Sequence, residues 1–378
     1  MSNILHIGLD AKRIVANATG LGNYGRTLAN DLAMFANIDL HLYAPDQGKQ
    51  DLRQLVTERS NLHYVFSDKK NALAKALWRS KGIVRQLQHD RIDIFHGLSG
   101  ELPIGIKKTG IKTVVTIHDL IFLRHPEYYN YLDVMLYKWK FHKTLIEADR
   151  IIAISECTRR DICEYAGIDE QQINVIYQSC NPRFHDKVSM QTMHAMRAKY
   201  ALPKKFILNV GSIEKRKNVL LAVNALCYLP NDICLVIVGK YTDYVNDINK
   251  VILKLGLSDR VKIFHGVPDK DLHAFYNMAD IFVYPSRYEG FGIPIIEAIN
   301  AGIPVVAATG SCLEEAGGPD CLYVSPDDPV EMANAIMKLN NESERTNRVE
   351  LSRQYITRFQ NLDVAGQIRD IYINLMHA

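Results

Sequence analysis

Short apolar runs alternate with longer amphipathic stretches along most of the chain. In the first half, this alternation predicts strands at 4–9, 38–43, 62–66, 92–96, 111–117, 150–154 and 173–177. Helices are expected between these strands, and the clearest are at 22–35, 71–89, 131–148 and 156–166. Repeated strand–helix units of this kind predict a parallel sheet with helices on both faces.

The same pattern restarts after about residue 185. Strands are expected at 206–210, 233–238, 261–264, 281–284 and 304–308, with helices near 218–228, 244–255, 270–278 and 293–301. From Pro329 onward the chain is helical and no longer alternates with strands. We therefore predict two doubly wound α/β domains, at 1–185 and 186–360, and a C-terminal helix at 361–378 that packs back on the first domain. The expected joint, Ser179 to Pro203, opens with the turn-forming pair Asn181-Pro182.

Composition is that of an ordinary globular protein, with 47% hydrophobic and 23% charged residues among 378. The net charge of +3 is too small to indicate nucleic acid as a partner. The seven cysteines form no C-x-x-C pair, which indicates a reducing compartment. No histidines stand at metal-ligand spacing along the chain, so we expect neither a bound metal nor a cofactor.

The first residues predict a strand rather than a signal peptide, and no apolar run reaches the ~18 residues that a membrane span needs. We expect a cytoplasmic protein.

Residues Glu289 to Glu297 read E-G-F-G-I-P-I-I-E and follow an apolar strand. Pro294 is expected at the first helical residue, which would place Glu297 in the first turn. Both acids would then lie on the carboxyl side of a strand, where open α/β sheets bind ligands. Gly290 and Gly292 allow backbone amides to approach a ligand closely. The alternative is a helix N-terminus with favourable acids and no ligand.

A second candidate site follows the strand at 206–210. That strand ends in Gly211, and Arg216 and Lys217 come shortly before a helix. Cations beside a helix N-terminus favour a bound phosphate, because the helix amides and the basic side chains all attract an anion. The alternative is a solvated run of charge.

Two candidates lie in the first half. His118 leaves a buried strand at its carboxyl end, with Asp119 beside it to orient the ring; the alternative is a structural histidine. Gly20, Gly22 and Gly25 form a literal G-x-G-x-x-G, but this motif does not follow its strand directly, as a dinucleotide site requires. We expect these glycines to form a mobile loop, with the following helix N-terminus directed towards an anion.

Two further features have weaker interpretations. Asp269 and Asp271 form a D-x-D at the expected start of a helix, where capping is a better explanation than a metal site. The basic and aromatic stretches at 70–91 and 137–143 suit an anionic membrane surface, although ordinary amphipathic helices explain them equally well.

Together these residues resemble the retaining family-4 glycosyltransferases of the GT-B fold, over essentially the whole chain. The carriers are Gly20-Leu21-Gly22-Asn23-Tyr24, Thr116-Ile117-His118-Asp119, Ile154-Ser155, Gly211 with Arg216-Lys217-Asn218, and the string from Glu289 to Glu297. Within the family, the likeness is to bacterial mannosyltransferase-type enzymes of surface-polysaccharide assembly. It implies two Rossmann-like domains facing across a cleft, with the C-terminal helix crossing back to the first.

The resemblance also implies roles for individual residues. Glu297 would bind the ribose hydroxyls of a nucleotide, and Glu289 would face the donor sugar. The amides of Gly290, Phe291 and Gly292 would lie near the sugar or the phosphate. Arg216 and Lys217, beside Gly211, would neutralise the diphosphate, and His118 would contact the donor sugar. Gly20 and Gly22 would line the loop below the diphosphate.

The chain departs from the family pattern at two places. Ser212 stands where many relatives carry an arginine, and Cys312-Leu313-Glu314-Glu315 replaces a more usual proline-containing loop. Both changes bear on contacts to the donor, although Glu315 still matches an acid of the family.

The activity implied is transfer of a hexose, with mannose favoured, from a nucleotide diphosphate sugar to an acceptor hydroxyl. GDP-mannose is the favoured donor, and a growing or lipid-linked surface glycan is the acceptor. The anomeric configuration would be retained without a metal, and the protein could contact the inner face of the plasma membrane peripherally. The competing classes are a GT-B sugar-nucleotide epimerase, an NAD-dependent oxidoreductase and a non-catalytic relative.

Overall fold

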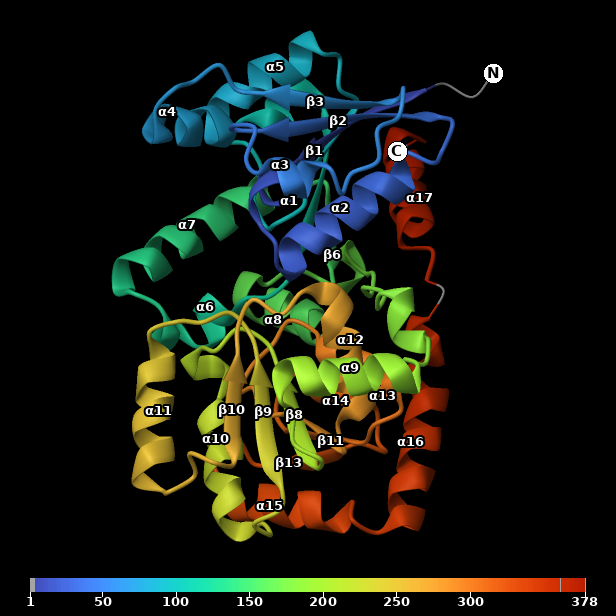
Figure 1. Cartoon of the computed structure of the whole chain (residues 1–378). Coiled ribbons are helices and arrows are strands. Elements are labelled where there is room, and N and C mark those ends of the chain that lie inside the picture. Colours follow the sequence, from blue (N-terminus) through green and yellow to red (C-terminus); the bar gives the residue numbers. More distant parts are fainter. Residues whose placement is uncertain (1–3, 361, 378) are drawn as a thin grey trace. The chain divides into compact units, whose positions relative to one another are not determined.

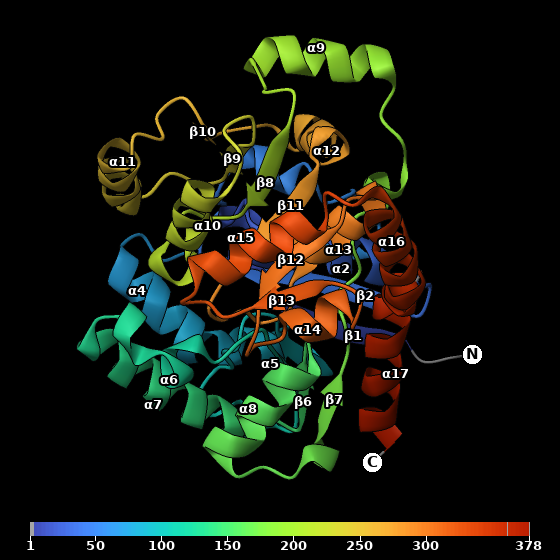
Figure 2. The same ribbon diagram turned by 90° about the horizontal axis from the view of Figure 1, so that it is seen from below.

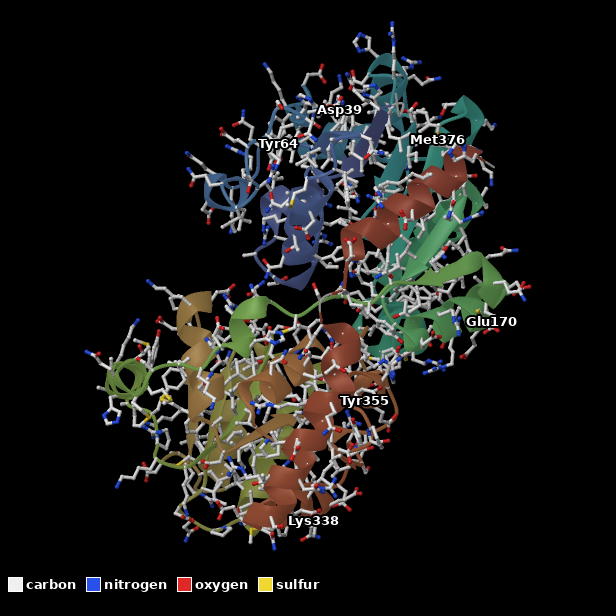
Figure 3. All side chains as sticks on the ribbon, turned by 90° about the vertical axis from the view of Figure 1, so that its right-hand side faces the viewer. Asp39, Tyr64, Glu170, Lys338, Tyr355 and Met376 are labelled. Atoms are coloured by element: carbon white, nitrogen blue, oxygen red, sulfur yellow. The ribbon has the colours of Figure 1, made fainter. Side chains whose placement is uncertain are left out.

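The computed structural model describes residues 4–360 and 362–377, and the chain divides into two compact units (Figure 1). The first unit comprises the chain up to Gln178 together with the segment from Leu362, and the second comprises Ser179–Asn361. The predicted domain at 1–185 and the predicted C-terminal helix at 361–378 include residues 1–3, 361 and 378, which lie outside the described residues. Figure 3 labels Asp39 and Met376 in the first unit and Lys338 and Tyr355 in the second.

The first unit is built on a parallel sheet of seven strands in the order β3-β2-β1-β4-β5-β6-β7. These strands are β1 (Leu5–Asp10), β2 (Ile38–Ala44), β3 (Leu62–Phe66), β4 (Ile94–Gly97), β5 (Lys112–Ile117), β6 (Arg150–Ala153) and β7 (Ile173–Val175). The strand order reverses direction between β1 and β4, and ligands of doubly wound sheets bind beyond the carboxyl ends of strands at such a point.

Helices cover both faces of this sheet. They are α1 (Lys12–Ala16), α2 (Gly20–Leu32), α3 (Gln50–Arg53), α4 (Ala72–Leu77), α5 (Ile83–His89), α6 (Ile121–Arg124), α7 (Tyr131–Glu147), α8 (Glu156–Ala166) and α17 (Val364–His377). On one face, buried side chains of α2 and α17, among them Leu28, Ile368 and Tyr372, pack on β1, β2 and β4. On the other face, α5, α7 and α8 contribute to a second core that includes Phe141 and Ile162. The C-terminal helix α17 therefore completes the core of the first unit.

The second unit contains a parallel sheet of six strands in the order β10-β9-β8-β11-β12-β13. Its strands are β8 (Phe206–Val210), β9 (Cys234–Val238), β10 (Val261–Phe264), β11 (Ile281–Tyr284), β12 (Val305–Ala308) and β13 (Leu322–Val324). Its helices are α9 (Met190–Tyr200), α10 (Val219–Ala225), α11 (Tyr244–Lys254), α12 (Asp269–Met278), α13 (Ile293–Ala301), α14 (Leu313–Gly317), α15 (Pro329–Lys338) and α16 (Glu342–Ile356). Figure 2 shows α10, α11 and α15 together on one side of the sheet, where their buried side chains share one core.

The second unit begins a few residues before the expected boundary at 185. The reason lies in the short 3-10 turn Pro182–His185, which follows the last strand of the first unit. Phe184 in this turn is fully buried, and its ring centroid lies 5.3 Å from that of Tyr276 on α12. This aromatic contact draws the segment into the second unit.

Most predicted strands agree with the structure within two residues, because buried parallel strands read as continuous apolar runs. β13, a strand of three residues, was not predicted. The helix expected over 71–89 is interrupted by a π-helical segment at Trp78–Gly82. No helix in the described part of the chain combines the length and hydropathy that a membrane span requires.

The expectation of a mobile glycine loop at 20–25 is wrong, because α2 begins at Gly20 and contains all three glycines. A Cβ at Gly22 would lie 1.8 Å from the carbonyl oxygen of Asn17. The buried Arg26 donates hydrogen bonds to Ile14 O and Asn17 O, both at 2.8 Å. Gly22 is thus required where the preceding segment lies against the helix. The motif also lacks the strand directly before it that a dinucleotide-binding site needs.

Candidate functional site

Three charged side chains meet in the second unit, on segments that follow the carboxyl ends of β8 and β11. Lys217 Nζ lies 2.5 Å from Glu289 Oε1, an ion pair without the alignment of a linear hydrogen bond. Arg216 Nη1 lies 3.1 Å from Glu289 Oε2. Lys217 Nζ also donates a hydrogen bond of 2.8 Å to the hydroxyl of Tyr284, the last residue of β11. We refer to Arg216, Lys217 and Glu289 as the charge cluster.

Arg216 and Lys217 are more than seventy positions before Glu289 in the sequence, and the local backbone geometry of the two segments brings them together. Arg216 and Lys217 occupy a 3-10 turn, Lys215–Lys217, that ends at Asn218 with a left-handed φ of 54°. The Asn218 side chain fixes this turn by donating a hydrogen bond of 2.7 Å to Pro326 O. The amide of Arg287 donates to Arg216 O at 2.8 Å and joins the turn to the segment after β11.

Glycine is needed where the segments after β8 and β9 approach each other. A Cβ on Gly239 would lie 1.7 Å from the carbonyl oxygen of Gly211. Gly211 itself adopts a φ of 152°, which side chains disfavour. The nearest side chain to a Cβ at Gly211 would be Lys217, so this glycine adjoins the charge cluster.

Electrostatics keep all three members of the charge cluster ionised. Burial alone raises the pKa of Glu289, but Lys217 and Arg216 outweigh it and hold that pKa below its usual value. Burial alone lowers the pKa of Lys217, but the Glu289 carboxylate outweighs it and raises that pKa. Two cations against one buried carboxylate leave a net charge of +1. The cluster therefore favours a further anion beside it.

The two cations differ in accessibility. The side chain of Lys217 is 11% exposed, whereas that of Arg216 is 19% exposed. Arg216 Nε also lies 3.3 Å from the carboxylate of Glu214, whose side chain is largely open to solvent. Arg216 is thus the cation that a ligand reaches more directly, with Lys217 beneath it.

Contacts with Cys312, Phe359 and Ala316 hold the segment from Gly290 to Gly292 in place. The buried thiol of Cys312 lies 2.6 Å from Phe291 O and 3.1 Å from Glu289 O. The ring of Phe291 is buried, with its centroid 5.2 Å from that of Phe359. A Cβ on Gly292 would lie 3.0 Å from Ala316 on α14. Cys312, which departs from the family pattern, therefore holds this backbone in place.

Glu297 has a different hydrogen-bond partner from the residues of the charge cluster. Its Oε2 accepts a hydrogen bond of 2.7 Å from the hydroxyl of Tyr276 on α12. Burial raises the pKa of Glu297 to about 7, against a smaller lowering by that hydrogen bond. The expectation that it lies in the first turn is wrong, because α13 begins at Ile293 and Pro294 is its second residue. The helix starts early because Gly292, with a φ of 139°, is its N-cap.

In the first unit, His118 is held by two hydrogen bonds. Its Nε2 lies 2.8 Å from Leu98 O and its Nδ1 lies 3.1 Å from Gln178 Nε2. Leu98 O can only accept and Gln178 Nε2 can only donate, which fixes the proton on Nε2. Burial lowers the pKa of His118 to about 4, so the ring is neutral at physiological pH. Asp119, expected to orient the ring, accepts a hydrogen bond from the amide of Ile121 at the start of α6.

A cleft in the first unit was not indicated by any motif. It is lined by Asp10, Arg79, Ser80, Ile83, Phe95, Glu101, Leu102, Pro103, Ile104, Trp139, Lys140, Lys143 and Thr144. Arg79 joins Asp10 to Glu101, and Lys140 Nζ lies 3.1 Å from Glu101. Asp10 ends β1, beside the point where the strand order reverses, and this position is the only signal in the sequence for the cleft.

The D-x-D at Asp269 has a structural role, but the capping expected from sequence is wrong, because Pro268 is the N-cap of α12 and no side chain caps this helix. Asp269 and Asp271 lie in the first turn of α12. Asp271 accepts hydrogen bonds from Lys199 at 2.6 Å and from the Tyr200 hydroxyl at 2.7 Å. These contacts fix α9 against α12 and occupy the carboxylate.

Comparisons with known proteins match both units. A family model described as Glycosyltransferase Family 4 matches residues 18–184, and one described as Glycosyl transferases group 1 matches residues 193–355. The O-antigen chain mannosyltransferase B of Escherichia coli is 28% identical over 258 residues, which cover 67% of this chain and 66% of that protein. The serotype-specific mannosyltransferase WbdA of Escherichia coli is 30% identical over 259 residues, which cover 65% of this chain and 32% of that protein.

The fold also has solved counterparts. The crystal structure of a glycosyltransferase from Rickettsia africae ESF-5 has a TM-score of 0.78 at 19% identity, covering 100% of this chain and 99% of that one. Two doubly wound parallel sheets, with a cationic cluster at the carboxyl edge of the second, define an α/β protein suited to an anionic ligand. Since the two matched models follow one another along the chain and the fold agrees, the chain belongs to the family-4 glycosyltransferases of the GT-B fold. It spans less than two thirds of the length of the two mannosyltransferases.

Proposed function

We propose that this protein transfers a hexose, with mannose favoured, from a nucleotide diphosphate sugar to an acceptor hydroxyl with retention of anomeric configuration. The charge cluster is the observation that carries the proposal, because its net positive charge suits a departing diphosphate. The names of the two mannosyltransferases favour mannose as the sugar, and GDP-mannose is the donor that we propose. Ser212 supplies no charge, so Arg216 and Lys217 carry the cationic role.

In the proposed reaction, the bond between the sugar C1 and the diphosphate oxygen breaks, and a bond from C1 to the acceptor oxygen forms. The acceptor proton passes to the departing diphosphate. Negative charge grows on that diphosphate as the bond breaks, and the Arg216 guanidinium stabilises it from a fixed position. Glu289 holds both cations in place and balances them before the donor binds.

The remaining predicted residues have supporting roles in this proposal. The amides of Gly290 to Gly292 approach the sugar or phosphate from a backbone that Cys312 fixes. Glu297, with Tyr276 on one oxygen, accepts a ribose hydroxyl on the other. His118, as a neutral ring with fixed hydrogen bonds, contacts the donor sugar. Gly20 and Gly22 shape the start of α2 near the diphosphate.

The test is donor turnover in matched variants. Arg216→Ala is expected to lower kcat by about 10²–10³, the usual cost of removing one preorganised electrostatic contact. Lys215→Ala is the matched control, since Lys215 is an exposed cation in the same 3-10 turn. Equal turnover in Arg216→Ala and Lys215→Ala would overturn the assignment. Turnover of the donor without any acceptor would instead indicate an epimerase.

We further propose that the acceptor is lipid-linked and that the first unit contacts an anionic membrane through α7. Large apolar side chains of this helix are exposed, including Tyr131 at 76% and Leu132 at 79%. The exposed Lys138 lies on the same helix, so the helix combines exposed apolar groups with positive charge, as interfacial helices do. Trp139 and Lys143 of α7 also line the cleft, which would place an acceptor next to the lipid surface.

Vesicle sedimentation tests this contact. Wild-type protein is expected to bind vesicles of phosphatidylglycerol and phosphatidylcholine, and to bind pure phosphatidylcholine much less. Leu132→Glu should reduce binding to the anionic vesicles several-fold. Leu253→Glu is the control, because Leu253 is 70% exposed on α11 of the second unit. Equal losses in the two variants, or no binding by the wild type, would contradict the membrane proposal and leave the donor assignment standing.

A further inference from the structure

Three histidines surround one carboxylate on the first sheet. Asp39 of β2, labelled in Figure 3, lies 3.0 Å from His6 Nδ1, 3.0 Å from His41 Nε2 and 3.0 Å from His63 Nε2. His6 belongs to β1, His41 to β2 and His63 to β3, so three neighbouring strands contribute. We refer to these four residues as the histidine cluster.

Strand register places the cluster on one face of the sheet. His6 stands opposite Asp39, and His63 stands opposite His41. Asp39 and His41 are two residues apart and therefore point to the same face. Gly8 is the residue opposite His41 on β1 and contributes no side chain there. The spacing of histidines along the chain gives no sign of this cluster, because the pairing of separate strands brings His6, His41 and His63 together.

The cluster is accessible and contributes little to holding the fold together. Side-chain exposures are 42% for His6, 17% for His41, 46% for His63 and 22% for Asp39. Hydrogen bonds and ion pairs this open to water stabilise a fold by only ~0–1 kcal/mol each. A purely structural role therefore explains poorly why three imidazoles converge on a single carboxylate.

The donor atoms fit a transition metal ion. Imidazole nitrogen and carboxylate oxygen are ligands of Zn²⁺, with bonds of about 2.0–2.2 Å in a tetrahedral site. Ligand atoms at the corners of such a tetrahedron are about 3.3 Å apart. The ligand atoms of His6, Asp39 and His41 all lie within 4.8 Å of one another, and each histidine nitrogen is 3.0 Å from a carboxylate oxygen. His63 lies outside this set of three, so an ion held by all four residues requires rotation of the exposed His63 side chain towards the other ligands.

We propose that His6, Asp39, His41 and His63 bind a divalent transition metal ion, with Zn²⁺ the best match. The ion takes the place of the protons now shared between the imidazoles and the carboxylate. It joins β1 and β2 to β3, which is the edge strand of the sheet and is only partly buried. The ion would therefore stabilise this edge of the first unit.

The position of the cluster makes the site structural. His6, Asp39 and His63 are the second residues of their strands and His41 is the middle residue of β2, so the cluster lies towards the amino edge of the sheet. Ligands of doubly wound sheets bind at the opposite, carboxyl edge. The ion is thus not part of the proposed transfer chemistry, and the inference stands whether or not the proposed function does.

The experiment is titration of full-length, tag-free, metal-stripped protein with Co²⁺ and Zn²⁺. One equivalent of Co²⁺ is expected to bind with the visible absorption of a tetrahedral site, and Zn²⁺ should displace it. Zn²⁺ should also raise the midpoint of thermal unfolding followed by tryptophan fluorescence. Both tryptophans, Trp78 and Trp139, belong to the first unit, so this signal reports on that unit alone.

Variants make the result decisive. His41→Ala and the more exposed His63→Gln should each weaken Co²⁺ binding by at least tenfold and abolish the thermal shift. His142→Ala is the control, because His142 is an exposed histidine of the same unit outside the cluster. Far-ultraviolet circular dichroism without metal confirms that each variant folds. Absence of a stoichiometric site, or a site that survives in both cluster variants, would overturn the proposal.

Discussion

At the scale of single residues, the charge cluster depends on a balance between two buried cations and one buried carboxylate. Neither Lys217 nor Arg216 could be assigned to Glu289 from sequence, because the residues are separated by more than seventy positions. Sequence did place all three at the carboxyl ends of strands. It could not show that Glu289 pairs with both cations before any ligand binds, since spacing along a chain does not encode contacts between loops.

Glu289→Gln is expected to destabilise the second unit. Removing one partner of a buried ion pair leaves uncompensated charge and costs about 3–5 kcal/mol. Here two cations lose their counter-charge, so added GDP should restore part of the stability by supplying an anion. Urea unfolding with and without GDP measures both effects.

Glu214→Gln is the control for this change. Glu214 also contacts Arg216, but its side chain is 42% exposed and solvent screens the pair. If Glu214→Gln and Glu289→Gln lowered the free energy of unfolding by similar amounts, the loss of the buried carboxylate would not be the cause of the destabilisation.

The raised pKa of Glu297 predicts that the stability of the protein depends on pH. Burial raises its pKa from an ordinary 4.5 to about 7 in the folded protein. A carboxyl group with a raised folded pKa stabilises the fold fully below its unfolded pKa, and that contribution falls as pH rises towards 7. Glu297→Gln cannot ionise, so the variant should gain stability relative to wild type between pH 5 and pH 8.

Chemical unfolding at pH 5 and pH 8 measures this difference. Glu350→Gln on the exposed side of α16 is the control and should show no such change. A wild-type–variant difference that stays constant with pH would mean that Glu297 is not titrating in this range. The same Glu297→Gln variant should bind GDP less tightly if the ribose contact exists.

At the scale of elements, strands were predictable because fully buried parallel strands are apolar throughout, as in β8 and β11. Helix starts were less predictable. α2 includes glycines that weaken a helix by propensity. The close approach of Asn17 explains Gly22, and a Cβ at Gly25 would lie 2.8 Å from the Ile14 side chain, whereas nothing lies within 4 Å of a Cβ at Gly20. The histidine cluster shows the same limit, since His6, His41 and His63 become neighbours only through strand register.

The two glycines at the start of α2 make a matched pair for mutation. Gly22→Ala places a Cβ 1.8 Å from Asn17 O, and the clash should cost well over 1 kcal/mol. Gly20→Ala meets nothing within 4 Å and should stabilise the protein slightly, by about 0.5–1 kcal/mol. Tryptophan-monitored urea unfolding distinguishes the two. Equal effects of both substitutions would contradict the contact between the Asn17 segment and α2.

At the scale of the whole molecule, both ends of the chain build the first unit. The hydroxyl of Tyr372 on α17 shares a hydrogen bond of 2.7 Å with Nδ1 of the fully buried His96 on β4. Sequence predicted a final helix that packs back, but it gave no sign of this partner 276 positions away. Burial lowers the pKa of His96 to about 3, so the ring stays neutral.

Tyr372→Phe should therefore destabilise the first unit selectively. The substitution leaves the buried Nδ1 of His96 without its hydrogen-bond partner, at a cost of about 1–3 kcal/mol. The midpoint of urea unfolding by tryptophan fluorescence should fall, while GDP affinity, which the proposed function assigns to the second unit, should stay unchanged. Tyr228→Phe, an exposed tyrosine of the second unit, is the control. Weakened GDP binding in Tyr372→Phe would contradict the separation of the two units.

The central claim is that the chain transfers a hexose from a nucleotide diphosphate sugar with retention. The most direct measurement is proton NMR of a reaction containing GDP-mannose and a mannoside acceptor. The account predicts release of GDP only when the acceptor is present, with an α-mannosidic product from the α-configured donor. A β-linked product, or no transfer from any nucleotide sugar tested, would contradict it.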